Sequence, residues 1–303
     1  MAEVEVNGGV VVYEWVGPED GERVVLTPGG RFSKDHGGVH ELAEGLAAGG
    51  KRVLLWDRPN CGSSDVQLFG QTESHMRAAT LAAMLEALGE GPVVALGGSG
   101  GARDMILFAI EYPHLVTKLG VWSIVGGTFS SMSLASVYAI NELRTVRAAG
   151  IEGILKLSGR AGSWADLVAA NPRNADRLRA IGAEEFERVF ERWFEAYVPK
   201  PNEPIPGVSE TRFAQIKVPT LIIRGGEKDY DHPKRTSYEV HALIPGSVLI
   251  DPPWPEDAWE QATRAVARGQ GSLFDPWQQA APVLLDFIDG RPVAERELAV
   301  RAS

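Results

Sequence analysis

The feature that most constrains the fold is a serine set between glycines, where an apolar run meets a helical segment. Ser99 stands in the pattern G-x-S-x-G with Gly97 and Gly101, after the predicted strand 93–96 and before the predicted helix 102–111. Because a serine on so tight a turn has strained backbone angles, its neighbours two residues away must be small. The pattern predicts a serine nucleophile. The alternative is a strand–helix turn or phosphate-binding loop with an incidental serine, although phosphate loops favour G-x-G-x-x-G or a following lysine.

Short apolar and β-branched runs recur along the chain, and segments of helical length separate most of them. The predicted strands lie at 23–27, 52–56, 93–96, 120–125, 220–224 and 248–251, after an opening hairpin over 3–13. The clearest helix is 73–88, which Thr72 or Ser74 can cap and Gly89 ends. Further helices are predicted at 235–243 and 276–288. This alternation predicts an α/β fold, with a mostly parallel sheet and helices on both faces.

One long segment interrupts the strand pattern. Between about residues 128 and 215 helical segments take over, at 133–149 and 184–197, and a proline-rich stretch follows at 199–206. We therefore expect a discontinuous core domain, made of residues 1–127 and 216–303, with a helical cap inserted at 128–215.

Composition excludes several classes of protein. The 303 residues carry 30 Lys+Arg against 40 Asp+Glu, a net charge of -10, so a nucleic-acid partner is not expected. One cysteine and no zinc-ligand spacing predict no metal and no cofactor, and fit a reducing compartment. Without a signal-like start or a long apolar run, we expect a cytoplasmic protein that spans no membrane and acts on a small molecule. The sequence leaves a homodimer open.

Several segments around the serine resemble the α/β-hydrolase fold, over nearly the whole chain. Residues 26–32 (LTPGGRF) resemble the oxyanion loop of that family, with Pro28 where the family usually has histidine, and residues 57–64 (DRPNCGSS) resemble its next turn. The resemblance implies an eight-stranded sheet and makes the Gly30 amide an oxyanion donor. The Gly100 amide, at the start of the helix, is the second expected donor.

The acid and the base of such a site are harder to place. Residues 220–229 (TLIIRGGEKD) resemble the strand and turn that carry the family's catalytic acid, which would be Asp229. The family's histidine follows the last strand, but here that strand runs into 252–257 (PPWPED), and no histidine follows His241. His232, three residues after Asp229 and held extended by Pro233, is our preferred base.

Other residues remain as alternatives for these two roles. His36 and His40 follow the oxyanion loop and are the second choice of base, whereas His75, His114 and His241 are interpreted as surface or packing residues. The carboxylates that could orient the base in place of Asp229 are Asp231, Asp251, Glu256 and Asp257.

The substrate pocket can be outlined only coarsely. Arg31 and Trp254 are candidates to line it, and Cys61 is interpreted as a small loop residue rather than a nucleophile. Four aromatic residues of the insertion have helical spacing, which favours cap core over ligand contacts: Phe186, Phe190, Trp193 and Phe194.

These patterns predict a serine hydrolase that acts through an acyl-enzyme on a small, mainly apolar ester, lactone, amide, C–C bond or related acyl substrate. Ser99 would attack, Gly30 and Gly100 would hold the oxyanion, His232 would move the proton and Asp229 would orient it. The acidic chain would weakly disfavour anionic substrates. The alternatives are a ligand-binding protein of this fold and a cofactor-free lyase or oxygenase, each with a degenerate triad.

Overall fold

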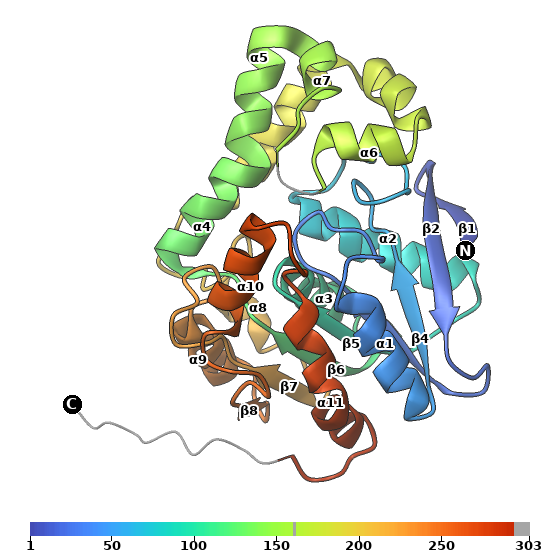
Figure 1. Cartoon of the computed structure of the whole chain (residues 1–303), viewed down its shortest axis with the longest axis vertical. Helices are drawn as coiled ribbons and strands as arrows, with labels where there is room; N and C mark the ends of the chain where they lie inside the picture. Colours follow the sequence, from blue (N-terminus) through green and yellow to red (C-terminus); the bar gives the residue numbers. More distant parts are fainter. Residues whose placement is uncertain (160–161, 294–303) are drawn as a thin grey trace.

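An eight-stranded sheet forms the centre of the molecule, in the order β1-β2-β4-β3-β5-β6-β7-β8 (Figure 1). The computed structural model describes residues 1–159 and 162–293. Strands β1 and β2 run antiparallel to their neighbours, and every pairing from β4 through β8 is parallel, which confirms the predicted fold class. The strands are β1 (Ala2–Val6), β2 (Gly9–Val16), β3 (Glu22–Thr27), β4 (Lys51–Trp56), β5 (Val93–Gly98), β6 (Val116–Trp122), β7 (Thr220–Ile223) and β8 (Val248–Ile250).

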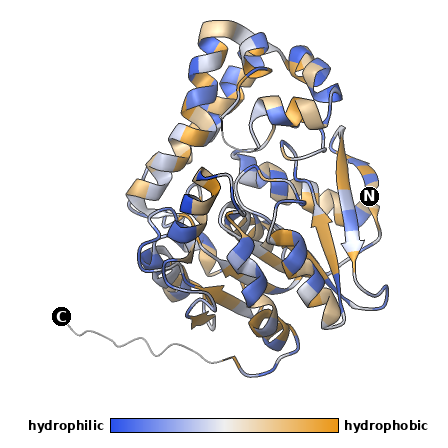
Figure 2. Cartoon of the chain, viewed as in Figure 1, coloured by the Kyte–Doolittle hydropathy of each residue, from blue (hydrophilic) through white to orange (hydrophobic). Residues whose placement is uncertain are grey.

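Two hydrophobic cores cover the two faces of the sheet, because successive strand residues point to opposite sides. Val25 of β3 and Leu54 of β4 belong to one core, which α2 (Glu73–Ala87), α3 (Gly100–Glu111), α8 (Glu210–Phe213) and α9 (Lys234–Leu243) complete. Their neighbours Val24 and Val53 belong to the other, with α1 (Val39–Ala48), α10 (Ala258–Ala267), η3 (Asp275–Ala280) and α11 (Ala281–Ile288). Figure 2 shows β4 as largely hydrophobic, as burial on both faces requires.

Most of the helices between β6 and β7 form a separate layer, which reaches the top of Figure 1. They are α4 (Gly127–Ala135), the π-helical turn η2 (Ser136–Ile140), α5 (Asn141–Ile154), α6 (Trp164–Ala170) and α7 (Arg173–Glu195). They have their own core, in which Phe186 and Phe190 stack at 4.3 Å beside Trp164 and Trp193. These aromatic side chains therefore pack in the core of this helical layer, and the interpretation of the layer as a cap stays a prediction.

The domain boundaries at 127/128 and 215/216 stay a prediction. Residues 160–161 of the predicted cap and 294–303 of the predicted core lie outside the described residues. Within the described ranges, no helix combines the length and apolar character needed to cross a membrane.

Two predicted elements differ from the structure. Strand β6 spans Val116–Trp122 rather than 120–125, because Ser123 has a positive φ of 47° that ends the strand before the apolar residues Ile124 and Val125. The predicted helix 276–288 is divided into a 3-10 turn and α11, with Pro282 in the first turn of α11, where its missing N–H costs nothing.

Candidate active site

Ser99 lies on the tight turn that joins β5 to α3, and its φ of 56° is in the left-handed region. A Cβ atom added at Gly97 would lie 2.4 Å from the carbonyl oxygen of Gly101, and one added at Gly101 would lie 2.2 Å from that of Thr27. Larger residues would therefore push the strand and the helix apart. The spacing that identified the turn in the sequence thus has a steric cause.

His232 reaches Ser99 from the loop that follows β7. Its Nε2 lies 2.8 Å from the Ser99 Oγ, and its Nδ1 lies 2.9 Å from the Asp229 Oδ2. Because a carboxylate only accepts hydrogen bonds, Nδ1 donates to Asp229, which leaves Nε2 as the acceptor for the Ser99 hydroxyl. The His232 backbone N–H also donates to the Asp229 Oδ1, at 2.9 Å. All three residues are buried, and the Trp259 ring packs edge-on against the imidazole.

The other histidines occupy different places. His36 is sandwiched between the rings of Phe32 and Phe274, and burial, partly offset by Asp275, lowers its pKa. His40 lies near Glu14 and Glu44, His75 contacts Thr72, His241 contacts Ser247, and His114 is exposed. Of the six histidines, all within the described ranges, His232 is the one with a hydrogen bond to Ser99.

The alternative carboxylates are also occupied elsewhere. Asp231 accepts a hydrogen bond from Trp259 Nε1 at 3.0 Å. Asp251 and Glu256 both bind Arg224, and Asp257 accepts from Gln261. The structure therefore brings Asp229 to His232 and leaves the other four candidates away from it.

Gly30 and Gly100 face each other beside Ser99. A Cβ atom added at Gly100 would lie 2.9 Å from the backbone nitrogen of Gly30. Gly100 is the first residue of α3, so its N–H has no acceptor within the helix. Both amides are thus positioned beside the serine, and their role as oxyanion donors stays a prediction.

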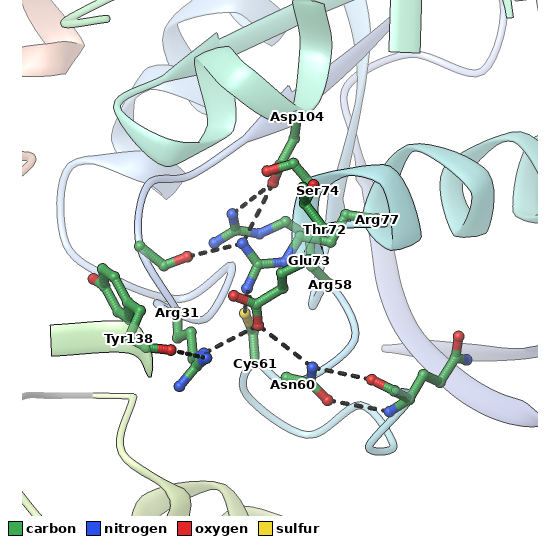
Figure 3. Close-up of polar contacts among 12 residues, drawn as sticks. Arg31, Arg58, Asn60, Cys61, Thr72, Glu73, Ser74, Arg77, Asp104 and Tyr138 are labelled. Atoms are coloured by element: carbon green, nitrogen blue, oxygen red, sulfur yellow. Dashed lines mark hydrogen bonds and ion pairs between the residues drawn. The ribbon is translucent and has the colours of Figure 1, made fainter. Parts of the chain in front are cut away.

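Three charged residues from different elements hold the loop that carries Gly30 (Figure 3). Arg58 is fully buried, donates to the carbonyl oxygen of Gly29 at 2.9 Å, and pairs with Asp104 at 3.0 Å. Arg77 donates to the carbonyl oxygen of Gly30 at 3.3 Å. None of the three is predicted from the sequence, although a charged residue among the apolar residues of a helix, as at Asp104, is a usable signal.

Glu73 extends this group toward the cap. It pairs with Arg31 at 3.0 Å and with Arg77 at 3.1 Å, and Arg31 pairs in turn with Glu142 of α5 at 2.5 Å. Burial would raise the pKa of Glu73, but the two guanidinium groups outweigh it and hold that pKa at about 2. Arg77 also contacts Cys61, whose thiol pKa is raised by burial, so Cys61 is a poor nucleophile.

A small pocket of about 40 Å³ lies in front of Ser99. Its lining includes Glu73, Arg77, Arg103, Leu134, Tyr138 and Tyr197. The pocket is therefore partly charged, whereas the sequence predicts a mainly apolar substrate. No group of histidine, cysteine, aspartate or glutamate residues in the described ranges could hold a metal ion.

The two predicted pocket residues lie outside this lining. Arg31 is buried in its ion pairs with two glutamates and joins the Gly30 loop to the cap. Trp254 packs in the core beneath α10 and borders a small cavity with Asp229 and Trp259. Arg31 borders two other cavities instead, one with Asp166 and one with Tyr138, and whether Arg31 or Trp254 contacts a substrate stays a prediction.

The chain matches a family model described as the alpha/beta hydrolase fold, over residues 23–150. It is 32% identical over 118 residues to a 2-hydroxy-6-oxononadienedioate/2-hydroxy-6-oxononatrienedioate hydrolase of Burkholderia vietnamiensis, and this match spans 39% of the chain but only 40% of the relative. It is 28% identical over 238 residues to a like-named hydrolase 2 of Pseudomonas putida, and this match spans 76% of the chain and 79% of the relative. It is 26% identical over 254 residues to the human serine hydrolase BPHL, and this match spans 82% of the chain and 77% of the relative.

Solved structures agree on the fold. An enol-lactonase from Burkholderia xenovorans has a TM-score of 0.56 at 15% identity, covering 95% of this chain and 100% of that one. A meta-cleavage product hydrolase from Pseudomonas fluorescens has a TM-score of 0.56 at 17% identity, covering 96% and 98%. The chain has the α/β-hydrolase fold, and its residues 23–150 match that family's model. The relatives named above are hydrolases.

Proposed function

We propose that the protein is a serine hydrolase that cleaves a small acyl substrate through an acyl-enzyme on Ser99. The observation that carries this proposal is the continuous hydrogen-bonded path from the Ser99 hydroxyl through His232 to Asp229, with lengths of 2.8 and 2.9 Å. A serine hydroxyl is a weak nucleophile by itself, and this path supplies the base that activates it and the carboxylate that orients the base.

In the proposed reaction, the Ser99 Oγ attacks the substrate carbonyl carbon while His232 Nε2 takes the hydroxyl proton. The resulting oxyanion lies between the amides of Gly30 and Gly100, and the protonated imidazole then gives its proton to the leaving group. A water molecule, deprotonated by the same nitrogen, hydrolyses the acyl-enzyme and regenerates Ser99. Asp229 stays ionised and stabilises the imidazolium that forms twice in the cycle.

The bond that is cleaved joins a carbonyl carbon to its leaving group, in an ester, a lactone or a comparable reactive acyl compound. One structural neighbour is an enol-lactonase, and several relatives are named for hydroxy-oxo dienoate or dienedioate substrates, which supports acyl transfer to water as the reaction type. A ligand-binding protein or a cofactor-free lyase has no need of a base bonded to Ser99, so the 2.8 Å contact favours the hydrolase over both.

Labelling with a fluorophosphonate probe tests the proposal. We expect the parent to be labelled on Ser99, Ser99→Ala to give no label, and His232→Ala to react at least roughly 100-fold more slowly. His114→Ala, which removes an exposed histidine, is the matched control and should react like the parent. An unlabelled parent would rule out the acyl-enzyme, and fast labelling of His232→Ala would rule out His232 as the base.

A further inference from the structure

Arg103 is a buried cation on α3, one helical turn beyond Ser99. Its side chain is held from two sides: Nε donates to Ser74 Oγ at 2.7 Å, and Nη2 donates to the Tyr197 hydroxyl at 3.3 Å. The guanidinium also lies over the Tyr197 ring, 5.1 Å from its centroid. The remaining nitrogen, Nη1, is buried and has no hydrogen-bond partner among the described residues. Only 4% of Arg103 is exposed, and the residue lines the same pocket as Ser99.

This guanidinium lacks a counter-charge, unlike the three others buried nearby. Those others pair with carboxylates as follows: Arg31 with Glu73 and Glu142, Arg58 with Asp104, and Arg77 with Glu73 and Asp104. Within the described ranges, no carboxylate oxygen lies within 4.0 Å of an Arg103 nitrogen. Four guanidinium groups thus face three carboxylates, and Arg103 is the surplus. Burying an unpaired ion is costly, so the arrangement is suited to a ligand that brings the missing negative charge.

We infer that Arg103 forms a carboxylate-binding subsite of the Ser99 pocket, so that the substrate carries a carboxylate group near its scissile carbonyl. This inference deepens the proposed function and rests on it for the reaction, although binding at Arg103 does not depend on Ser99 reacting. A carboxylate oxygen can accept from the unpartnered Nη1, and a charge-assisted bond in a buried site is strong.

The geometry limits the kind of anion. Ser99, at the start of α3, and Arg103, in its first turns, line one small pocket, so they can contact two ends of a short molecule. Glu73 lines the same pocket and is ionised, so it repels a second negative charge. A monoanionic carboxylate therefore fits better than a dianionic phosphate ester. The positive charge of Arg103 in the pocket thus favours an anionic substrate, although the net charge of -10 would weakly disfavour one.

Paired methyl esters test the subsite in turnover. Monomethyl succinate, glutarate and adipate place a carboxylate at increasing distance from a methyl ester, and the dimethyl diesters are neutral partners of the same length. We expect the parent to prefer at least one monoacid over its diester by roughly 10-fold or more in kcat/KM. Arg103→Met should lose roughly 10- to 100-fold on that monoacid and little on the diester. Arg103→Lys should keep part of the preference, and Arg235→Met, which removes an exposed charge, should keep all of it.

Binding to the Ser99→Ala protein tests the subsite without turnover. We expect calorimetric titration with the preferred monomethyl ester to give a Kd that rises roughly 10-fold or more when Arg103→Met is added. Binding that depends on Arg103 in a protein that turns over no ester would keep the subsite and overturn the proposed function. Ester turnover by the parent with no preference for a monoacid at any length, and no saturable binding, would overturn the subsite alone.

Discussion

The two sides of the Ser99 site are built in opposite ways. On one side, His232 and Asp229 come from a single loop and contact each other through two short hydrogen bonds, and a third joins His232 to Ser99. On the other side, the loop of Gly30 is held by Arg58 and Arg77, which come from separate elements and depend on partners far along the chain. The first arrangement is local and involves one carboxylate, whereas the second is a distributed set of buried charges. We therefore expect damage to the first to affect chemistry, and damage to the second to affect folding as well.

The largest expected effect comes from Asp229→Asn. Asparagine can donate to the imidazole, so it favours the tautomer in which Nε2 carries the proton and cannot accept the one from Ser99. We expect kcat to fall roughly 10³- to 10⁴-fold, with a change in unfolding free energy of about 1–2 kcal/mol. Steady-state hydrolysis of a 4-nitrophenyl ester measures the first, and urea unfolding the second. Asp231→Asn is the control, since Asp231 bonds Trp259; an equal loss there would contradict the assignment.

Arg58→Met should instead act on both stability and activity. It leaves Asp104 buried with a weaker partner, Arg77, at 3.6 Å, and it releases the carbonyl of Gly29. We expect the unfolding free energy to drop by about 3–5 kcal/mol and kcat to drop roughly 10- to 100-fold through a displaced Gly30 amide. Urea unfolding and steady-state kinetics measure the two changes.

A double variant sharpens that prediction. Arg58→Met combined with Asp104→Leu removes both charges, so it should recover much of the lost stability but little of the activity. If the double variant is as unstable as the sum of the single variants, the two residues do not act as a buried ion pair.

The contrast between the two sides also explains what could be predicted from sequence. His232 was identifiable because it lies three residues from Asp229 in a loop whose strand could be recognised. Arg58 and Asp104 are 46 residues apart in the chain, and nothing in either local pattern indicates that they meet. Local spacing therefore predicts contacts within a loop, and long-range ion pairs require the fold.

The same reasoning applies to the misplaced elements and pocket residues. The predicted strand 120–125 misses the first residues of β6, where the charged Lys118 interrupts the apolar pattern. The Lys118 side chain donates to the carbonyl oxygen of Ile288, a long-range contact that the sequence does not indicate. The sequence makes Trp254 and Arg31 pocket candidates, but neither lines the pocket in front of Ser99. Core packing and ion pairing, which depend on distant partners, turn them elsewhere.

Acid should weaken the charged side through Glu73. Its pKa is about 2 in the folded protein, below the ordinary 4.5, so the unfolded chain binds the proton more readily. The stabilisation is complete above pH 4.5 and is lost as the pH falls from 4.5 through 2. We expect Glu73→Gln to be less stable at neutral pH and to lose less stability over that window, measured by urea unfolding at a series of pH values. Equal slopes for variant and parent would contradict this role.

A smaller pH effect is expected from His36. Burial lowers its pKa below the ordinary 6.5, so the folded protein favours the neutral ring. Its contribution is complete above pH 6.5 and is lost as the pH falls below that value, until the pH passes the folded-state pKa. His36→Leu should flatten the stability profile just below pH 6.5, in thermal unfolding followed by circular dichroism. His114→Leu, at an exposed position, should leave the profile unchanged.

The placement of Asp229 and His232 in one loop has a mechanical consequence. If that loop shifts as a unit, the 2.9 Å contact between imidazole and carboxylate moves with it, and only the 2.8 Å distance to Ser99 changes. A single displacement of the loop therefore makes or breaks the contact between His232 and Ser99. If the acid and the base lay on separate loops, both loops would have to move together to keep the imidazole and the carboxylate in contact. The Trp259 ring packs edge-on against the imidazole, and hydrogen bonds from Ser130 and Trp259 to Asp231 also hold this loop.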